Sequence, residues 1–596
     1  MKEGPSSERV IHQLPPSRRG GLKQEGRNTS MEEKNYWLRR RYSRRTAMKG
    51  AGLAGAGAGA FALVGCGDDD STSSTPPASG TKGLLPTTAA SPTPAKVAKA
   101  GGSFSFQIPS PPPSLDPYTS TSYLNGYMNS LSYSKLYRFK AGVSEVAPAD
   151  FSQEIDLASA MPEQPDQLTY NIKLKQGVKF HNGRAMTSED VRYAFDRYIN
   201  FDKSVHKSGL SFVDKMETPD ANTIKITSKV PYADTVNYLG GNLGVYISPK
   251  EHAESAEATT KMVGSGPFIH TEFQTGVSLS FKKNPDYYDK PYPYFDDVKA
   301  FIVTDQAKRV ADFSANSVNL TWLFLADERD QLKKSRPDAK FEETQGIGGY
   351  IYFRTDKPPF NDKRVRQAIS LGINRKAMRD ALTKGEGVPD QLYHVGYPFA
   401  RQTKDLGANA KFWDYNPTEA KKLLVAAGQE NISTTWDHAD AAIYTQAYVD
   451  KATLQQADLK QIGFTIKDQQ APYAQYISTT YQGQYEGMGH SPRAVPYWLD
   501  FITERFTMKP KRGRINLSYV NDPKLEDLMD KQRSQFVTAE RLQTVKAIED
   551  VLAEEQYEVY DNTDTRTFFW DKDIQNYRPT AWFPYTHIMK SWRDKA

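Results

Sequence analysis

The 596-residue chain is 38% hydrophobic, has one cysteine, Cys66, and carries a formal net charge of +6. Residues 1–66 contain 13 Lys and Arg against 5 Asp and Glu, so residues 67–596 have a net charge of −2. A nearly neutral body without a basic stripe of interleaved aromatics excludes nucleic acid as the partner. Because no cysteine follows Cys66, disulfides cannot hold the fold together, and a hydrophobic core must do so.

The N-terminal segment predicts an export signal. Residues 51–65 are uncharged and would form a helix of about 22 Å, which is short for a hydrocarbon layer of about 30 Å. Several Arg and Lys residues precede it, as in the charged start of a signal peptide. Leu63–Cys66 resembles a bacterial lipobox, in which the thiol is acylated and the chain is cut before it. Arg44 and Arg45 resemble a twin-arginine motif; general secretion is the alternative route.

Residues 67–100 are rich in Ser, Thr, Pro and Ala. Such a segment has too little apolar surface to offset the entropy lost on ordering, so we expect a disordered linker. From residue 101 the composition changes to one with frequent Tyr, Phe and Trp. The length of 101–596 suggests two or three domains.

Two elements in the first half of the body can be predicted from their sequence patterns. Thr187 and Asp190 have the spacing of a helix-capping box, and apolar residues follow at helical spacing: Val191, Ala194, Phe195 and Tyr198. Residues 268–273 and 277–284 flank the turn sequence QTG, which predicts a β-hairpin. In its second strand, Val277, Leu279 and Phe281 alternate as they do when one face is buried.

Three later segments are helical by pattern. Val365, Ala368 and Ile369 predict a buried helical stripe, and residues 416–428 predict a helix that Asn416 and Pro417 open and Gly428 stops. Another helix passes through Leu459 and ends at residue 463, before the strand-like sequence FTIKD. Helices and strands therefore mix throughout the body, which favours an α/β (mixed α+β) fold.

Four segments carry a family resemblance. They are YNIKLKQGVKFHNGRAMTSEDVRYAFDRYI, VGSGPFIHTEFQTGVSLSFKKNPDYYDKPYPYFDDV, GGYIYFRTDKPPFNDKRVRQAISLGINRKAM and YNPTEAKKLLVAAG. In this order they resemble the signature segments of family 5 bacterial solute-binding proteins, over about residue 102 to the C-terminus. These proteins are extracytoplasmic receptors of ABC importers for oligopeptides, dipeptides, nickel complexes and some oligosaccharides.

The resemblance implies a periplasmic-binding-protein-like fold with two lobes and an inserted third domain. Lobe I would comprise 102–140, 240–345 and 566–596, the inserted domain 141–239, and lobe II 346–565. Together with the lipobox, it predicts a lipid-anchored, monomeric receptor in the periplasm or on the extracytoplasmic face of the membrane. Such a receptor binds a peptide or similar organic solute between its lobes and delivers it to the permease, without catalysis, cofactor or metal.

The same resemblance suggests the ligand contacts, all in segments that approach ligand in the family: Tyr123, Tyr350, Tyr352, His490, Arg493, Tyr497 and Trp498. Aromatic faces suit a receptor for varied side chains, because they offer stacking area without requiring one hydrogen-bond pattern. Core packing is the alternative for each tyrosine. Peptide-binding members have an aspartate for the peptide ammonium, but residues 491–496 read SPRAVP and contain no acid. Arg493 stands there instead, and a surface position or a pair with Asp500 is its alternative.

Two other functions fit the same sequence. A secreted hydrolase is one, although no HExxH, Walker or GxSxG motif occurs. Its triad could still be assembled across the fold. A receptor that reports its solute to a sensor is the other. Asp437–Asp440 (DHAD) is a local group of metal-ligand type, for which a polar loop is the favoured interpretation.

Overall fold

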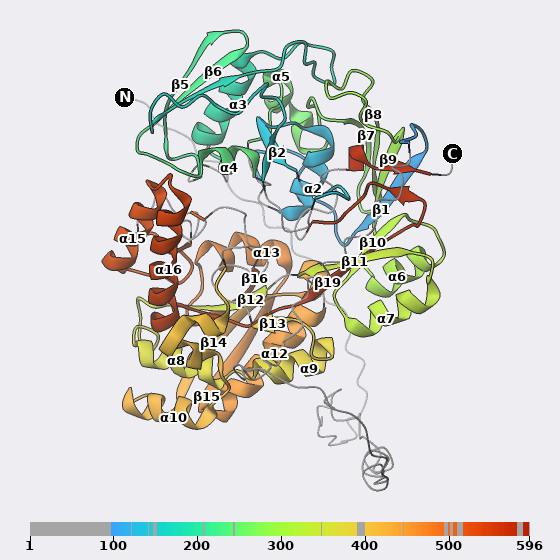
Figure 1. Ribbon diagram of the computed structural model, residues 1–596. Helices are drawn as coiled ribbons and strands as arrows, with labels where there is room; N and C mark the ends of the chain where they lie inside the picture. The colour runs from blue at the N-terminus through green and yellow to red at the C-terminus, as the bar shows by residue number, and fades with distance from the viewer. Residues whose placement is uncertain are drawn as a thin grey trace, which may run out of the picture. The chain divides into compact units, whose positions relative to one another are not determined.

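The computed structural model describes residues 97–120, 122–140, 142–146, 152–204, 207, 209–241, 245–346, 348–389, 400–444, 446–493, 499–500, 505–508, 516–580 and 588–594 (Figure 1). All of them belong to the unit Pro92–Ala596. The predicted export signal, with Arg44, Arg45 and Cys66, lies outside the described residues. None of the helices within those ranges is both long enough and apolar enough to span a bilayer.

Helices and strands alternate along the described part of the chain around three larger sheets, which confirms the predicted mixed α/β class. We call the part built on the seven-stranded sheet lobe I, the part on the five-stranded sheet lobe II, and the part on the three-stranded sheet the inserted domain. The chain starts in lobe I, passes through the inserted domain, returns, crosses into lobe II and ends in lobe I (Figure 1). The residue boundaries given above stay a prediction.

The strand order of lobe I is β11-β19-β10-β1-β9-β8-β7. These strands are β1 (Ser103–Ile108), β7 (Phe268–Gln274), β8 (Ser278–Lys283), β9 (Asp297–Ile302), β10 (Leu320–Leu323), β11 (Lys340–Gln345) and β19 (Thr565–Trp570). β1 is parallel to β9 and β10, and β19 is antiparallel to β10 and β11. The other elements are α2 (Tyr123–Ser132), α6 (Gln306–Ser314), α7 (Ala326–Ser335), β20 (Ile574–Gln575), η5 (Ile588–Lys590) and β21 (Trp592–Arg593).

The inserted domain packs the predicted capped helix on its sheet. Its larger elements are β4 (Thr169–Lys173), α3 (Ser188–Asn200), β5 (Val213–Asp220) and β6 (Thr223–Ser228), and β2 (Tyr137–Phe139), β3 (Gln153–Ile155), α4 (Thr235–Gly240), α5 (Lys250–Ala253) and η2 (Ala256–Thr259) flank them. The Asp190 carboxylate accepts a hydrogen bond from the Thr187 backbone at 2.9 Å. Val191, Ala194 and Phe195 are fully buried. Both the cap and the apolar face of this helix are confirmed.

The strand order of lobe II is β15-β14-β16-β12-β17. These strands are β12 (Gly348–Phe353), β14 (Ile432–Ala439), β15 (Phe464–Ala471), β16 (Met488–Arg493) and β17 (Glu558–Tyr560). The helices are α8 (Lys363–Gly372), α9 (Arg375–Thr383), η3 (Thr403–Trp413), α10 (Pro417–Ala426), α11 (Ala441–Tyr444), α12 (Gln446–Gln461), α13 (Tyr473–Ser478), η4 (Thr480–Gln482), α15 (Pro523–Arg533) and α16 (Thr538–Glu555), and β13 (Val388–Pro389) pairs with β18 (Asn562–Thr563). All six residues of β12 are buried, as in a strand covered on both faces.

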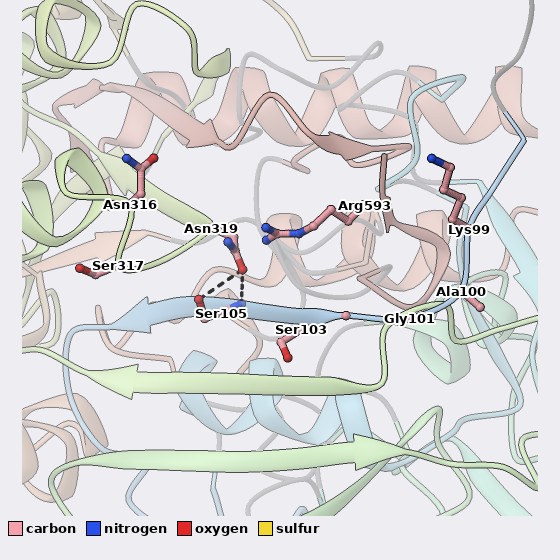
Figure 2. Close-up of a pocket in the computed structure, with 10 residues that line it drawn as sticks. Lys99, Ala100, Gly101, Ser103, Ser105, Asn316, Ser317, Asn319 and Arg593 are labelled. Carbon is pink, nitrogen blue, oxygen red and sulfur yellow. Dashed lines mark hydrogen bonds between the residues drawn. The ribbon is translucent and has the colours of Figure 1, made fainter. Parts of the chain in front are cut away.

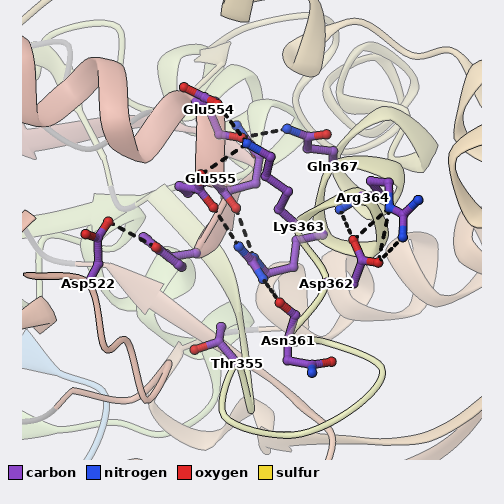
Figure 3. A network of polar contacts seen from close by, with 12 residues as sticks. Thr355, Asn361, Asp362, Lys363, Arg364, Gln367, Asp522, Glu554 and Glu555 are labelled. Carbon is purple, nitrogen blue, oxygen red and sulfur yellow. Dashed lines mark hydrogen bonds and ion pairs between the residues drawn. The ribbon is translucent and has the colours of Figure 1, made fainter. Parts of the chain in front are cut away.

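The start of α8 and the end of α16 are joined by charged contacts (Figure 3). Lys363 Nζ donates to Glu554 Oε1 at 2.8 Å, and Arg366 Nη2 donates to Glu555 Oε2 at 3.2 Å. Arg364, on the exposed side, pairs with Asp362 instead. Because Val365, Ala368 and Ile369 are fully buried, the predicted stripe of α8 is confirmed.

The other predicted elements are confirmed with two corrections. Residues 268–283 form the β7–β8 hairpin, but Val277 precedes β8 and is 55% exposed, because the turn lies one residue later than predicted, at 275–277. α10 begins at its predicted cap, and α12 gives way to β15 through Gly463. DHAD is not a polar loop: it ends β14, and His438 is buried beside Asp468. In the ranges that the structure describes, no group of three or more His, Cys, Asp and Glu could hold a metal ion.

Candidate functional site

The chain crosses from lobe I to lobe II between β11 and β12 and returns between β18 and β19, and the two crossings touch. The Gly346 N–H donates to the Asp564 carbonyl at 2.6 Å. A Cβ on Gly346 would lie 2.8 Å from that oxygen, so this close approach requires glycine. Lys451 of α12 holds the returning segment, with its Nζ 2.8 Å from Asp564 Oδ1. The two crossings are therefore adjacent.

One face of the lobe II sheet beside the crossings is aromatic. Tyr350 and Tyr352 alternate on β12, with ring centroids 5.7 Å apart, and neither is more than 1% exposed. The Tyr352 hydroxyl lies 3.2 Å from that of Tyr476. Burial raises the pKa of Tyr350 and Tyr352 well above 10, so both phenols stay neutral. They can therefore supply apolar contact area and a neutral hydrogen bond.

Charged side chains border this aromatic face. The Arg505 guanidinium lies 4.0 Å from the centroid of the Tyr350 ring and forms an ion pair with Glu558. Tyr560 donates its hydroxyl hydrogen to the same carboxylate at 3.0 Å. Arg493, at the end of β16 and opposite Gly348 in the ladder, has its guanidinium 4.6 Å from the Tyr560 ring centroid. At 1% exposure, Arg493 does not take the surface position that was its alternative.

The opposite face of the same sheet holds His490 in a buried ionic network. Asp561 Oδ2 lies 3.3 Å from His490 Nε2, and Asp561 Oδ1 lies 3.7 Å from Lys451 Nζ and accepts from the Gly349 N–H at 2.8 Å. Burial opposes ionisation of Asp561, but Lys451 and His490 outweigh it and hold its pKa well below the usual range. Burial lowers the pKa of His490 despite Asp561, so its imidazole is neutral at pH 7.

Lobe I contributes a second arginine among aromatic rings. Arg566 on β19 is 2% exposed, and its guanidinium lies 4.6 Å from the Phe568 ring centroid and 5.4 Å from that of Trp322. It also hydrogen bonds to Tyr127 of α2; burial raises the pKa of that phenol, and Arg566 opposes the rise. Both lobes thus place a buried arginine against aromatic side chains.

The start of α2 is a direct contact between the lobes. Ser122 caps α2 by accepting from the Leu124 N–H at 3.3 Å, and it lies close enough to Tyr473 of α13 to oppose the rise that burial causes in the pKa of that phenol. Tyr123, the first residue of α2, therefore follows a residue that touches lobe II, while the placement of its own side chain is not described. Tyr497 and Trp498 lie outside the described residues.

A separate polar pocket of about 450 Å³ lies at the start of β1 (Figure 2). Asn319 closes one side by accepting from the Ser105 N–H at 2.7 Å. The two basic residues that line the pocket both have acidic neighbours. Lys99 Nζ lies 3.6 Å from Asp594, and an Arg593 nitrogen lies 4.0 Å from Asp571. The pocket is lined by residues of the lobe I part alone, so we do not assign the ligand to it.

The structure thus brings Tyr350, Tyr352 and Arg493 to one face of the lobe II sheet and places His490 on the other. Whether they contact ligand stays a prediction. The charged residues that accompany them were not predicted from the sequence: Lys451, Arg505, Glu558, Asp561 and Arg566. A signal for Glu558, Asp561 and Arg566 was present in YEVYDNTDTRTFFW (557–570), where acids and an arginine interrupt an otherwise strand-like sequence.

Residues 154–507 match the family described as bacterial extracellular solute-binding proteins, family 5 middle. The glutathione-binding protein GsiB of Pectobacterium atrosepticum is 28% identical over 324 residues, which are 54% of this chain and 60% of that protein. Di/tripeptide-binding protein 1 of Pseudomonas aeruginosa is 26% identical over 383 residues, which are 60% of this chain and 69% of that protein. The match thus spans about 60% of the length of the first of these relatives.

Solved structures share the fold. The oligopeptide-binding protein AppA of Bacillus subtilis, in complex with a nonapeptide, has a TM-score of 0.74 at 20% identity, over 84% of this chain and 100% of that one. The periplasmic binding protein DppA of Helicobacter pylori, in complex with the peptide STSA, has a TM-score of 0.72 at 20% identity, over 83% and 99%. These likenesses confirm the predicted two-lobed, periplasmic-binding-protein-like fold.

Proposed function

Because this chain belongs to family 5 of the bacterial extracellular solute-binding proteins, we propose that it is the substrate-binding protein of an ABC importer. It binds a peptide or similar organic solute between lobe I and lobe II and presents it to the permease as a monomer, without catalysing a reaction. The family match is the observation that carries this proposal. The peptide class is supported by the names of two relatives, a glutathione-binding and a di/tripeptide-binding protein.

Of the contacts that the resemblance suggested, we propose Tyr123, Tyr350, Tyr352, Arg493, Tyr497 and Trp498; His490 is left out, because it lies on the opposite face of the lobe II sheet beside Asp561. Closure of the lobes expels water and places each polar contact in a lower dielectric. The ligand favours the closed form only by its additional affinity for that form, and a micromolar ligand has about 8 kcal/mol of binding free energy in all. The permease then recognises the closed form.

Arg493 sets the charge of the ligand in this proposal. A guanidinium is always ionised and presents a planar fork suited to a carboxylate, so Arg493 favours an anionic group on the solute. Burial against the Tyr560 ring supports this role, because a charge held away from water is screened less than an exposed one. A peptide would then be bound through its C-terminal or side-chain carboxylate.

Mass spectrometry of solutes that co-purify with the protein tests the proposal; we expect a peptide or an organic acid. Calorimetry with the identified solute should show that the Arg493→Ala protein binds it more weakly. The binding free energy should fall by a few kcal/mol, as expected for the loss of a desolvated charge pair. Arg366→Ala removes another buried arginine of lobe II, which pairs with Glu555, and should leave the affinity unchanged. An Arg493→Ala affinity within about twofold of the parent's would contradict the role of Arg493. Turnover of the solute would contradict the receptor function.

We further propose that Cys66 carries a lipid and anchors the protein outside the cytoplasmic membrane. Two or more acyl chains, at about 0.8 kcal/mol per buried CH₂, anchor a protein far more firmly than one. The Cys66→Ser protein should therefore appear in the soluble or uncleaved fraction. Membrane-bound Cys66→Ser protein of processed mass would contradict the lipid anchor, and normal export after replacing Arg44 and Arg45 by Lys would indicate general secretion.

A further inference from the structure

The inserted domain contacts lobe II through buried charges. Asp234 directly precedes α4 and is fully buried. Arg541 of α16 donates to it from both terminal nitrogens, with Nη1 3.0 Å from Asp234 Oδ1. The backbone N–H of Asp500 donates to Asp234 Oδ2 at 2.9 Å. One carboxylate of the inserted domain therefore binds two separate segments of lobe II.

The surrounding contacts complete this network. Gln532 bridges its two halves: Oε1 accepts from Arg541 Nε at 3.0 Å, and Nε2 donates to Asp500 Oδ1. Arg533 stands 3.4 Å from Asp500 Oδ2, and its guanidinium lies 4.8 Å from the Tyr232 ring centroid. The backbone also joins the two parts, because the Ala233 N–H donates to the Arg533 carbonyl at 2.8 Å.

The charges of the network balance across the contact. Asp234 and Asp500 face Arg541 and Arg533, and all four are at most 6% exposed. A buried pair is stable while both partners are present, whereas separation lets water solvate each half. The contact lies beside α15 and α16, away from the ends of β11 and β19 at which the chain crosses between the lobes (Figure 1). The two parts can therefore separate here while the chain connections between the lobes stay intact.

We propose that Asp234, Asp500, Gln532, Arg533 and Arg541 form a latch by which the inserted domain holds lobe II in the closed arrangement. The latch sets the balance between open and closed receptor, and thus the apparent affinity for solute. This inference rests on the proposed binding between the lobes, but the latch itself acts without ligand. It gives the inserted domain a function: it fastens lobe II at a place other than the interlobe chain crossings.

Distance measurements by electron spin resonance on the ligand-free protein test the latch. In the full chain with Cys66→Ser, spin labels at Met161→Cys and Val425→Cys report the inserted domain and lobe II; these side chains are 50% and 56% exposed. Asp234→Asn and Arg541→Ala should each raise the ratio of long to short distances by about tenfold or more. Labels at Met161→Cys and Val277→Cys, on the inserted domain and lobe I, should show no change.

Two controls keep the result specific. Arg366→Ala breaks a buried pair inside lobe II and should leave the Met161–Val425 distances unchanged. The double variant Asp234→Asn/Arg541→Gln removes both charges and should open the protein less than Arg541→Ala does, because no unpaired charge stays buried. Thermal melting identifies any variant that fails to fold. Unchanged distances in folded Asp234→Asn and Arg541→Ala proteins would overturn the latch, whereas absence of any bound solute would overturn only the proposed function.

Discussion

Two buried ionic networks in this protein have similar chemistry but join different parts of it. Within lobe II, Asp561 contacts Lys451 and His490, and all three belong to that lobe. At the latch, Asp234 of the inserted domain contacts Arg541 of lobe II. Asp561 and Asp234 are equally buried, at 1% and 0% exposure. Burial and charge are thus alike, and the difference lies in whether one folded part or two supply the partners.

That difference decides what each network stabilises. A buried pair within one part breaks only when the part unfolds, so its partners contribute to the free energy of unfolding. A pair between two parts can also break by rigid-body separation, after which water solvates each charge. The same chemistry therefore supports the fold in lobe II and a conformation at the latch.

The largest effect is expected for Asp561→Ala. The substitution removes the buried acceptor of the Gly349 N–H and of the Gln455 amide, while Lys451 keeps the Asp564 carboxylate 2.8 Å from its Nζ. We expect a loss of about 3 to 5 kcal/mol in the free energy of unfolding, measured by urea denaturation. Asp234→Ala should lose less, because separation of the two parts relieves the unpaired Arg541. A larger loss for Asp234→Ala would show that the latch also belongs to the fold.

Glu549 provides a pH-dependent probe of lobe II alone. Burial raises its pKa from 4.5 to about 8, and the nearby Arg401 does not cancel this rise. Between these values the folded protein keeps the proton and the unfolded chain does not, so stability falls as pH rises from 4.5 to 8. Glu549→Gln should remove this fall, worth about 2 to 4 kcal/mol at pH 8. Denaturation at pH 5 and pH 8 measures it.

The pH slope should be the same in the Asp234→Asn protein, because Glu549 and the latch charges act on different equilibria. If the dependence of stability on pH changed in that variant, the titration of Glu549 would be coupled to the latch. If stability still fell between pH 5 and pH 8 in the Glu549→Gln protein, another group would cause the fall.

Local pattern predicted the elements well, because the forces that form them act between near neighbours. The Thr187–Asp190 cap and the helix from Asn416 to Gly428 depend on residues within a few turns of one another. The error at Val277 has a local cause too, since alternation does not fix where a turn ends. The fold itself came from the family resemblance of four segments.

The charged networks could not be predicted, because their partners lie far apart in the sequence. Arg541 and Asp234 are 307 residues apart, and Gly349 and Asp561 are 212 apart. A buried charge and an exposed one have the same sequence signature until the fold supplies the partner. For the same reason, tyrosine content indicated stacking surface, but not that Tyr350 and His490 would lie on opposite faces of one sheet.

Gly349→Ala should have an intermediate effect. A Cβ at this position would lie 2.2 Å from an Asp561 carboxylate oxygen, so the carboxylate must move away from its contacts. We expect a loss of about 1 to 3 kcal/mol in the free energy of unfolding. Gly349→Ala combined with Asp561→Ala should cost less than the sum of the two, because the clash disappears with the carboxylate. If the losses of the two single variants simply added, the strain in Gly349→Ala would not come from a clash with the Asp561 carboxylate.

The smallest effect is expected for Arg364→Ala on the exposed side of α8. Its guanidinium pairs with Asp362, but the Arg364 side chain is 45% exposed, so solvent screens the pair. An exposed ion pair contributes little to the free energy of unfolding. Arg366, two residues further on, has a side chain only 3% exposed and donates to Glu555 and to the Phe360 carbonyl at 2.7 Å. Arg366→Ala should therefore destabilise lobe II more than Arg364→Ala in the same denaturation experiment. Equal losses would mean that burial does not separate strong from weak charge pairs here, and the contrast between the lobe II network and the latch would then need another cause.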